Sequence, residues 1–151
     1  MILKLRDIFD QGSILLNLTG TTKQEVFSEL ADAMAAVHPE ISQSVILASL
    51  WEREKKLSTG IVPGIAIPHA ICGGIGITAG AIGISKTGID YDSLDKKPVH
   101  VIFMMVMGEG AKENHLHILE QVFSLVRTEA IALIENAKSA EEIHAVLSRF
   151  N

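Results

Sequence analysis

The sequence predicts a single α/β domain over residues 1–151, in which a mixed central β-sheet is flanked by helices on both faces. The chain is long enough to bury one sizeable core. Apolar residues make up 48% of it and charged residues 21%, a balance typical of a compact globular protein. Segments with strand patterns and helix patterns are interspersed, with pairs of helices before and after a run of strands.

The first predicted elements are a strand and two helices. Residues 13–18 are short and apolar and end before a polar turn, so they predict a strand. Thr22 and Glu25 form the pattern of a capping box, which predicts a helix that ends before Pro39. A second helix is expected from about residue 42 to residue 56.

Arg53 interrupts the apolar pattern of this second helix. At about 100° per residue, Ile46, Leu50 and Leu57 fall within about 60° of one another and of Arg53. The arginine therefore shares the apolar stripe. Two explanations stay open: its aliphatic stem lies on the core edge with its head in water, or its guanidinium binds an anion.

Residues 57–70 combine a turn, a buried segment and a stiffened backbone. Glycines and a proline indicate the turn, and Ile65, Ala66 and Ile67 form a short apolar segment after it. Pro68 locks its own φ and biases the preceding residue toward an extended conformation. His69 is therefore expected on a rigid backbone, where its role is either structural or reactive.

The remaining elements follow in chain order. We expect a loop at 71–76, a strand at 77–85, turns at 86–89 and 95–98, a buried central strand at 99–107, a helix from about 113, and shorter helices at 130–137 and 139–150. The helix from about 113 is predicted to bury Leu116, Leu119, Val122, Phe123 and Val126. His115 lies in its first turn, where free N–H groups and the helix dipole favour anions.

Composition excludes several classes of protein. No apolar run reaches the roughly 20 residues of a membrane helix, and the N-terminus lacks a signal-peptide pattern. We therefore expect a cytoplasmic protein that is not inserted in a membrane. The formal net charge of −5 argues against nucleic-acid binding. Cys72 is the only cysteine, which excludes an internal disulfide and a multi-cysteine zinc site.

Common catalytic motifs are absent from the sequence. It has no G-x-S-x-G elbow and no P-loop, and its Gly-Ile-Gly segment at 74–76 lacks the context of a dinucleotide site. His115 and His117 point in different directions on a helix, and a zinc site formed by His69, Cys72 and His115 stays open. His69 remains as a nucleophile, because an imidazole with a pKa of about 6.5 is largely neutral near pH 7 and can attack a phosphoryl group.

Two motifs resemble those of a known family. The run from Trp51 to His69, Trp-Glu-Arg-Glu-Lys-Lys-Leu-Ser-Thr-Gly-Ile-Val-Pro-Gly-Ile-Ala-Ile-Pro-His, resembles the phosphorylation-site signature of fructose/mannitol-type enzyme IIA domains of the bacterial phosphoenolpyruvate-dependent phosphotransferase system. The run His-Leu-His-Ile-Leu at 115–119 is similar to the family's second block. The resemblance spans nearly the whole chain, and its opening residues 3–18 are similar to the nitrogen-regulatory branch.

The resemblance implies a role for each site residue. His69 would accept a phosphoryl group from the phosphocarrier protein HPr or its nitrogen-system paralogue, His115 would hydrogen-bond the phosphoryl oxygens, and Arg53 would neutralise them. Thr59 and Gly64 would belong to the phosphoryl-binding turn, where the Thr59 hydroxyl either bonds the phosphoryl group or caps the turn. No metal or other cofactor is expected, since donor and acceptor are both histidines and Arg53 supplies the cation.

The chain departs from the family pattern at a few positions. Val62 and Pro63 stand where a glycine and a polar residue are usual, Leu57 where a glycine is common, and Ile71 where a polar or basic residue is frequent. None of these departures removes a reacting group. Two alternatives to a regulatory phosphocarrier stay open: a sugar-specific component that passes phosphate to a IIB domain, and a IIA-like module that binds regulatory target proteins without carrying phosphate.

Overall fold

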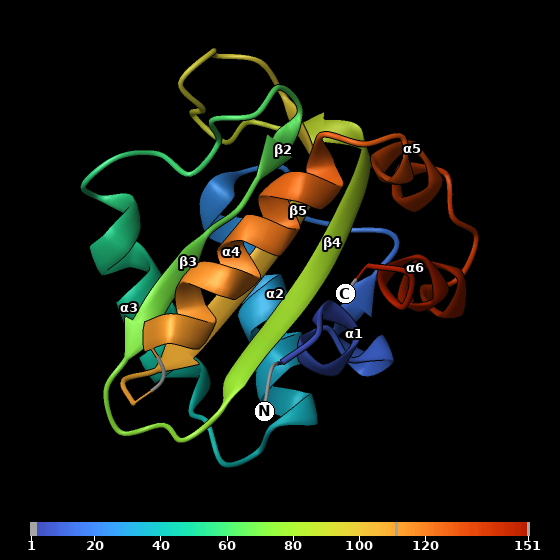
Figure 1. The fold of residues 1–151 in the computed structure, drawn as a ribbon. Helices are drawn as coiled ribbons and strands as arrows, with labels where there is room; N and C mark the ends of the chain where they lie inside the picture. Colours follow the sequence, from blue (N-terminus) through green and yellow to red (C-terminus); the bar gives the residue numbers. More distant parts are fainter. Residues whose placement is uncertain (1–2, 111, 151) are drawn as a thin grey trace.

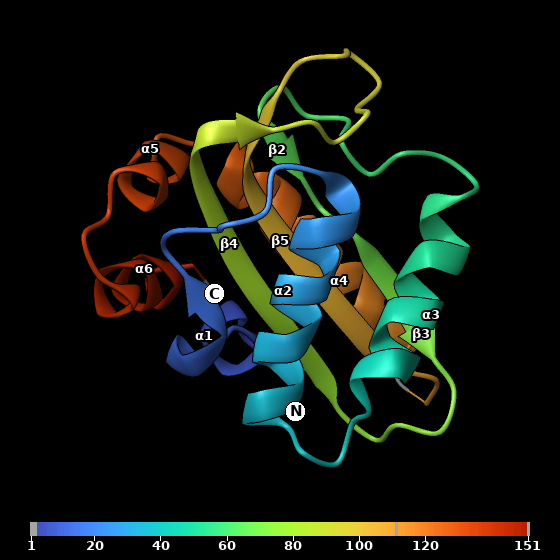
Figure 2. The same cartoon turned by 180° about the vertical axis from the view of Figure 1, so that it is seen from behind.

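A mixed β-sheet crosses the centre of the protein, between two layers of helices (Figures 1 and 2). The computed structural model describes residues 3–110 and 112–150. The sheet contains β1 (Ile14–Leu15), β2 (Ile65–Ala66), β3 (His69–Cys72), β4 (Thr78–Ile89) and β5 (Val99–Gly108). Its order is β1-β4-β5-β2, and β3 also pairs with β5. Strands β4 and β5 are antiparallel, whereas every other pairing is parallel.

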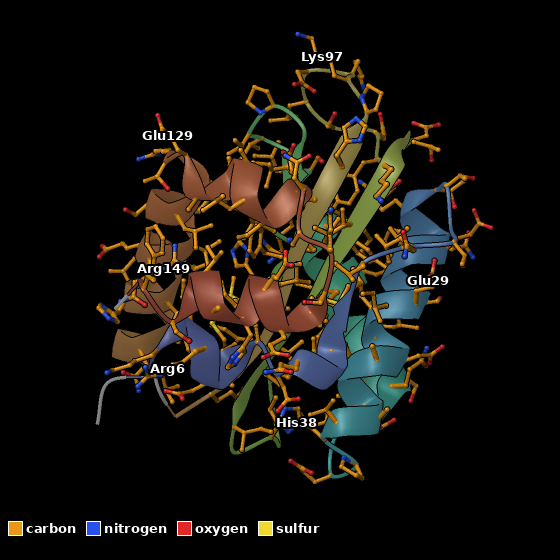
Figure 3. All side chains as sticks on the ribbon, turned by 90° about the vertical axis from the view of Figure 1, so that its right-hand side faces the viewer. Arg6, Glu29, His38, Lys97, Glu129 and Arg149 are labelled. Carbon is orange, nitrogen blue, oxygen red and sulfur yellow. The ribbon has the colours of Figure 1, made fainter. Side chains whose placement is uncertain are left out.

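The helices are divided between the two faces of the sheet. One face is covered by α2 (Lys23–Val37) and α3 (Gln43–Glu54), and the other by α1 (Leu5–Ile8), α4 (Lys112–Val126), α5 (Ala130–Glu135) and α6 (Ala140–Leu147). The view in Figure 3 shows the two layers on opposite sides, with Glu29 on one and Glu129 and Arg149 on the other. The predicted fold class, a mixed sheet with helices on both faces, is therefore confirmed.

The alternation of side chains along β5 explains why two helical layers are needed. Successive residues of a strand point to opposite faces, and almost every residue of β5 is apolar. Val101, Phe103 and Met105 pack into the core under α4, α5 and α6. Ile102, Met104 and Val106 pack into the core under α2 and α3. Both faces of the central strand are thus buried, as expected for residues 99–107.

Strands β2 and β3 form one edge of the sheet with a short break between them. Ile65 pairs with Val101 in β2, and His69 pairs with Met105 in β3. Within the break, the carbonyl oxygen of Pro68 accepts a hydrogen bond of 2.9 Å from the amide of Met105. The edge therefore continues along β5 across the proline, and His69 is the first residue after it.

Most helices lie where the sequence predicts them. The helix after Thr22 begins with a complete capping box, because the Thr22 hydroxyl accepts from the amide of Glu25 and the Glu25 carboxylate accepts from the amide of Thr22. Helix α3 and the three helices after β5 also match their predicted segments to within a few residues at each end. No helix among the described residues is both long enough and apolar enough to span a membrane.

Several local predictions are wrong. The strand expected at 13–18 is shorter in the structure, where β1 contains only Ile14 and Leu15. Ser13 belongs instead to a 3-10 turn, Gln11–Ser13. The loop expected at 71–76 begins later, since Ile71 and Cys72 pair with β5. The turn expected at 86–89 is instead an irregularity inside β4, where the register shifts and Gly88 has a φ of 96°. Helix α1 was not predicted.

Candidate active site

The ring of His69 is held by the backbone immediately before it. Its Nδ1 atom lies 2.7 Å from the carbonyl oxygen of Ile67. A carbonyl oxygen can only accept a hydrogen bond, so Nδ1 carries the proton and the lone pair of the neutral ring lies on Nε2. The amide of Ile67 donates to the carbonyl oxygen of Thr59, which ties this segment to the preceding turn. His69 is therefore a neutral imidazole with one defined nucleophilic nitrogen.

The environment of His69 favours this neutral ring. Burial is the largest effect and lowers the pKa of His69 below its usual value, and the nearby positive charge of Arg53 lowers it further. The hydrogen bond to Ile67 and the negative charge of Glu54 act in the opposite direction. Since the net pKa shift is downward, Nε2 is unprotonated at neutral pH and is available for attack.

His69, His115 and Arg53 line the same pocket. The pocket has a volume of 520 Å³ and lies among α3, β3, the end of β5 and the start of α4, which are neighbours in Figure 1. Its lining comprises Ser49, Glu52, Arg53, Lys56, His69, Ala70, Ile71, Met107, His115 and Leu119. The three residues for which the resemblance implies phosphoryl chemistry are thus brought together from three separate elements.

Arg53 lies near the C-terminal end of α3, on the side that faces the pocket. Its Nη1 atom donates a hydrogen bond of 2.8 Å to the carbonyl oxygen of Leu57, which also satisfies one of the free carbonyls after the helix. Among the side chains that the structure describes, no carboxylate forms an ion pair with Arg53. The guanidinium is therefore anchored at one nitrogen and keeps further donors for an anion.

His115 presents an unusual buried nitrogen to this pocket. The residue is 6% exposed, and its Nε2 atom donates a hydrogen bond of 2.8 Å to the carbonyl oxygen of Gly108. Its Nδ1 atom is buried without a hydrogen-bond partner in the described part of the chain. A buried polar atom without a partner is costly. An arriving ligand that bonds Nδ1 would remove this cost.

The structure places Thr59 and Gly64 outside the lining of this pocket. The Thr59 hydroxyl is buried and bonds Glu54 Oε1 at 2.6 Å and the Tyr91 hydroxyl at 2.7 Å. Gly64 has a φ of 77°, which suits glycine, and its carbonyl oxygen accepts from the amides of His100 and Val101. In this structure both residues shape the turn before β2 rather than the wall of the pocket.

Three residues behind the site were missed in the sequence: Lys23, Glu54 and Tyr91. Glu54 lies four residues after Leu50 and eight after Ile46, so helical spacing already put it on the buried stripe. A carboxylate at the C-terminal end of a helix also opposes the helix dipole. These two signals could have marked Glu54 as a residue with buried partners.

The geometry does not favour the zinc alternative. His69 and Cys72 are three residues apart in β3, so their side chains lie on opposite faces of the strand. Burial raises the pKa of the Cys72 thiol, which disfavours the thiolate that zinc binds. Within residues 3–110 and 112–150, no three histidine, cysteine or acidic side chains gather as metal ligands.

Comparisons with known proteins identify relatives that match this chain over nearly its whole length. The nitrogen regulatory protein of Pseudomonas aeruginosa is 31% identical over 97% of this chain and 96% of its own length. A fructose-specific EIIABC component of Bacillus subtilis is 32% identical over 99% of this chain but 23% of its own length. The crystal structure of nitrogen regulatory protein IIA-Ntr from Neisseria meningitidis superposes with a TM-score of 0.87 at 28% identity, covering 95% of this chain and 98% of that one.

A family model gives the same assignment over almost the whole chain. The model described as "Phosphoenolpyruvate-dependent sugar phosphotransferase system, EIIA 2" matches residues 7–150, which include every element of the sheet and the whole pocket. The resemblance of the motifs at 51–69 and 115–119 is thus confirmed at the level of the family. The chain belongs to the EIIA 2 family of the phosphoenolpyruvate-dependent sugar phosphotransferase system.

Proposed function

We propose that this phosphotransferase component carries a phosphoryl group on Nε2 of His69. The single observation that carries the proposal is the hydrogen bond between Nδ1 of His69 and the carbonyl oxygen of Ile67. It leaves Nε2 as the free nitrogen of a neutral ring, in a pocket that also contains Arg53 and His115. Phosphoryl transfer asks a protein mainly for this kind of positioning and for stabilisation of charge on the phosphoryl oxygens.

In the proposed transfer, the lone pair of Nε2 forms a bond to phosphorus while the donor's bond to phosphorus breaks. The leaving atom of the donor keeps that electron pair. Nδ1 of His69 retains its proton and its hydrogen bond to Ile67, so the phosphorylated ring carries a positive charge. No proton has to leave His69 during the step.

Arg53 and His115 would bind the phosphoryl oxygens from two sides. The guanidinium supplies a permanent positive charge and planar donors, which suit two oxygens at once. A hydrogen bond between Nδ1 of His115 and a third oxygen would give the partnerless nitrogen its partner. Neither role requires a metal ion.

We propose HPr or its nitrogen-system paralogue as the phosphoryl donor. Ile71, which lines the pocket, is 51% exposed, and Leu116, the residue after His115, is 63% exposed. Well-exposed apolar side chains next to a functional pocket support a surface on which another protein docks. The proposal keeps the cytoplasmic location expected from the sequence.

We further propose a regulatory rather than a sugar-transport role. Its support is the similarity to nitrogen regulatory proteins over nearly their whole length, in both sequence and structure. The fructose-specific relative keeps the second candidate open, in which the phosphoryl group passes to a IIB domain. Transfer from the phosphorylated protein to a purified fructose-type IIB domain would favour that second candidate.

The test is phosphorylation in a purified system. The protein is incubated with phosphoenolpyruvate and either enzyme I and HPr or their nitrogen-system counterparts, and its intact mass is measured. We expect a gain of one acid-labile phosphoryl group that is lost in His69→Ala and retained in His38→Ala, a histidine of the loop after α2. No gain with either donor set would contradict the proposal and favour the binding module that carries no phosphate.

A further inference from the structure

A buried carboxylate lies directly behind the active site. Glu54 is 6% exposed, although it follows Arg53 at the end of α3. Its Oε2 atom accepts from Lys23 Nζ at 2.9 Å and from the amide of Thr59 at 3.0 Å, and its Oε1 atom accepts from the Thr59 hydroxyl at 2.6 Å. A buried charge is tolerated only with such partners. Glu54 is therefore fully paired.

The hydrogen bonds around Glu54 have fixed directions. The carboxylate can only accept, so the single hydroxyl proton of Thr59 is donated to it. The Tyr91 hydroxyl, 2.7 Å from Thr59 Oγ1, must then donate its own proton to Thr59. Lys23 completes the cluster, because its ammonium also lies 4.5 Å from the centre of the Tyr91 ring.

This cluster connects to His69 through the backbone. Thr59 is held at both its amide and its hydroxyl by Glu54, and its carbonyl oxygen accepts from the amide of Ile67 at 3.1 Å. The carbonyl oxygen of Ile67 in turn accepts from Nδ1 of His69. Four elements thus meet at one carboxylate: the start of α2, the end of α3, the turn before β2, and the segment after β4.

Glu54 also acts on His69 by its charge. The pocket surrounds His69 with Glu52, Arg53 and Lys56 from the α3 side and with His115 from α4. Arg53 opposes a positive charge on the His69 ring, and Glu54 favours it. The phosphorylated ring carries that positive charge, so a nearby buried anion stabilises the product as well as the transition state.

We propose that Glu54, held by Lys23, is a positioning residue for phosphoryl transfer: together with Tyr91 it holds Thr59 and thereby the Ile67 carbonyl that orients the His69 ring, and its charge stabilises that ring once phosphorylated. This proposal rests on the function proposed above. It gives Glu54 no contact with the phosphoryl group, which distinguishes it from Arg53 and His115.

The main test compares Glu54→Gln with Glu141→Gln, the same change at an exposed site on α6. Glutamine keeps the size and one acceptor oxygen but removes the charge. We expect the maximal rate of phosphoryl acceptance to fall about tenfold in Glu54→Gln, with the KM for the donor changed less than twofold. Glu141→Gln should match the unaltered protein in both quantities.

A second readout needs no donor. The ring of His69 is titrated by NMR in the unphosphorylated protein, and its signal is assigned from its absence in His69→Gln. We expect a lower pKa of His69 in Glu54→Gln than in the unaltered protein, because a charge that favours the protonated ring is gone, and no change in the pKa of His38. A merely structural role would leave this pKa in place.

The outcomes separate the two proposals. A folded Glu54→Gln with unchanged maximal rate and unchanged His69 pKa would overturn the role of Glu54. Failure of the unaltered protein to accept phosphate would overturn the proposed function instead, whatever the NMR titration shows. If Glu54→Gln does not fold, Thr59→Val takes its place in the test, because it removes the hydroxyl that bonds Glu54 and keeps the charge of Glu54. We expect a reduced maximal rate with the His69 pKa preserved. An unchanged maximal rate would overturn the proposal.

Discussion

Nε2 of His115 donates to the carbonyl oxygen of Gly108, the last residue of the central strand, across a distance of 2.8 Å. This bond ties the start of α4 to the end of β5 and turns Nδ1 of His115 toward a buried site where it has no partner in the described residues. His69 shows the complementary arrangement, with Nδ1 bonded to backbone and Nε2 left free. Each histidine thus bonds the backbone through one ring nitrogen, and we propose that the other nitrogen takes part in phosphoryl transfer.

Removal of His115 should slow transfer without unfolding the domain. We expect His115→Ala to lower the rate of phosphoryl acceptance roughly 100-fold, the usual effect of losing one donor to a charged transition state. The domain should stay folded, although the Gly108 carbonyl oxygen loses a hydrogen bond and the stability falls by about 1–3 kcal/mol. Rates with purified donor and urea unfolding measure the two effects.

His117→Ala is the matched control, since His117 lies on the same helix but does not line the pocket. Its rate should stay within twofold of the unaltered protein. Unfolding of His115→Ala at room temperature would show that His115 is a structural residue rather than a site residue.

Arg53 should be needed for its charge and its shape. Arg53→Ala is expected to reduce transfer by roughly 100-fold to 1000-fold, and Arg53→Lys to recover only part of the loss, because an ammonium cannot bond two phosphoryl oxygens in one plane. Arg149→Ala, an exposed arginine after α6 (Figure 3), serves as the control. Equal rates for Arg53→Lys and the unaltered protein would mean that only the charge matters.

The pH dependence of stability follows from the lowered pKa of His69. Its folded pKa lies below the unfolded value, so between the two values the unfolded chain binds more protons. The stability that His69 contributes by staying neutral is complete above the unfolded value of about 6.5 and is lost as the pH falls toward the folded value.

Urea unfolding at two pH values tests this dependence. Between pH 7.5 and pH 5.5, the free energy of unfolding should decrease more in the unaltered protein than in His69→Gln, which has no titrating group at this position. A decrease of the same size in both proteins would contradict the lowered pKa of His69.

The three residues His69, Arg53 and His115, which share one pocket, could be singled out in the sequence because their signals are local. Pro68 before His69 indicated a stiff backbone, and helical spacing alone put Arg53 on the inner side of α3. What escaped prediction depends on contacts between distant segments. The pairing of Ile71 and Cys72 with β5 requires a partner strand more than thirty residues away, and the cluster of Lys23, Glu54 and Tyr91 requires the folded arrangement of several elements.

The face of α4 shows a different kind of error. Apolar residues alone predicted that Leu116 points inward, but it is 63% exposed. The buried stripe contains His115, Ile118, Val122, Leu125 and Val126, so the prediction is confirmed for Val122 and Val126 and wrong at the start of the helix. A histidine occupies the inward position there. Because the pattern treats histidine as polar, it put Leu116 on the buried face in place of His115.

This outward position makes Leu116 available to a partner and leads to a prediction on docking. Ile71 lines the pocket and Leu116 follows His115 outside the pocket lining, and both side chains are exposed. A minority of interface residues dominates binding, and truncation of such a residue costs more than about 1 kcal/mol. We therefore expect Leu116→Gln and Ile71→Gln each to raise the KM for the phosphoryl donor about fivefold to thirtyfold, with little change in the maximal rate.

The comparison with Leu133→Gln makes this prediction specific. Leu133 is 53% exposed, close to the values for Ile71 and Leu116, but it lies on α5 and does not line the pocket. Its substitution should leave both kinetic constants unchanged. If the donor docked elsewhere, all three variants would behave alike. If the two side chains acted on the transfer step instead of on docking, their substitution would lower the maximal rate and leave KM in place.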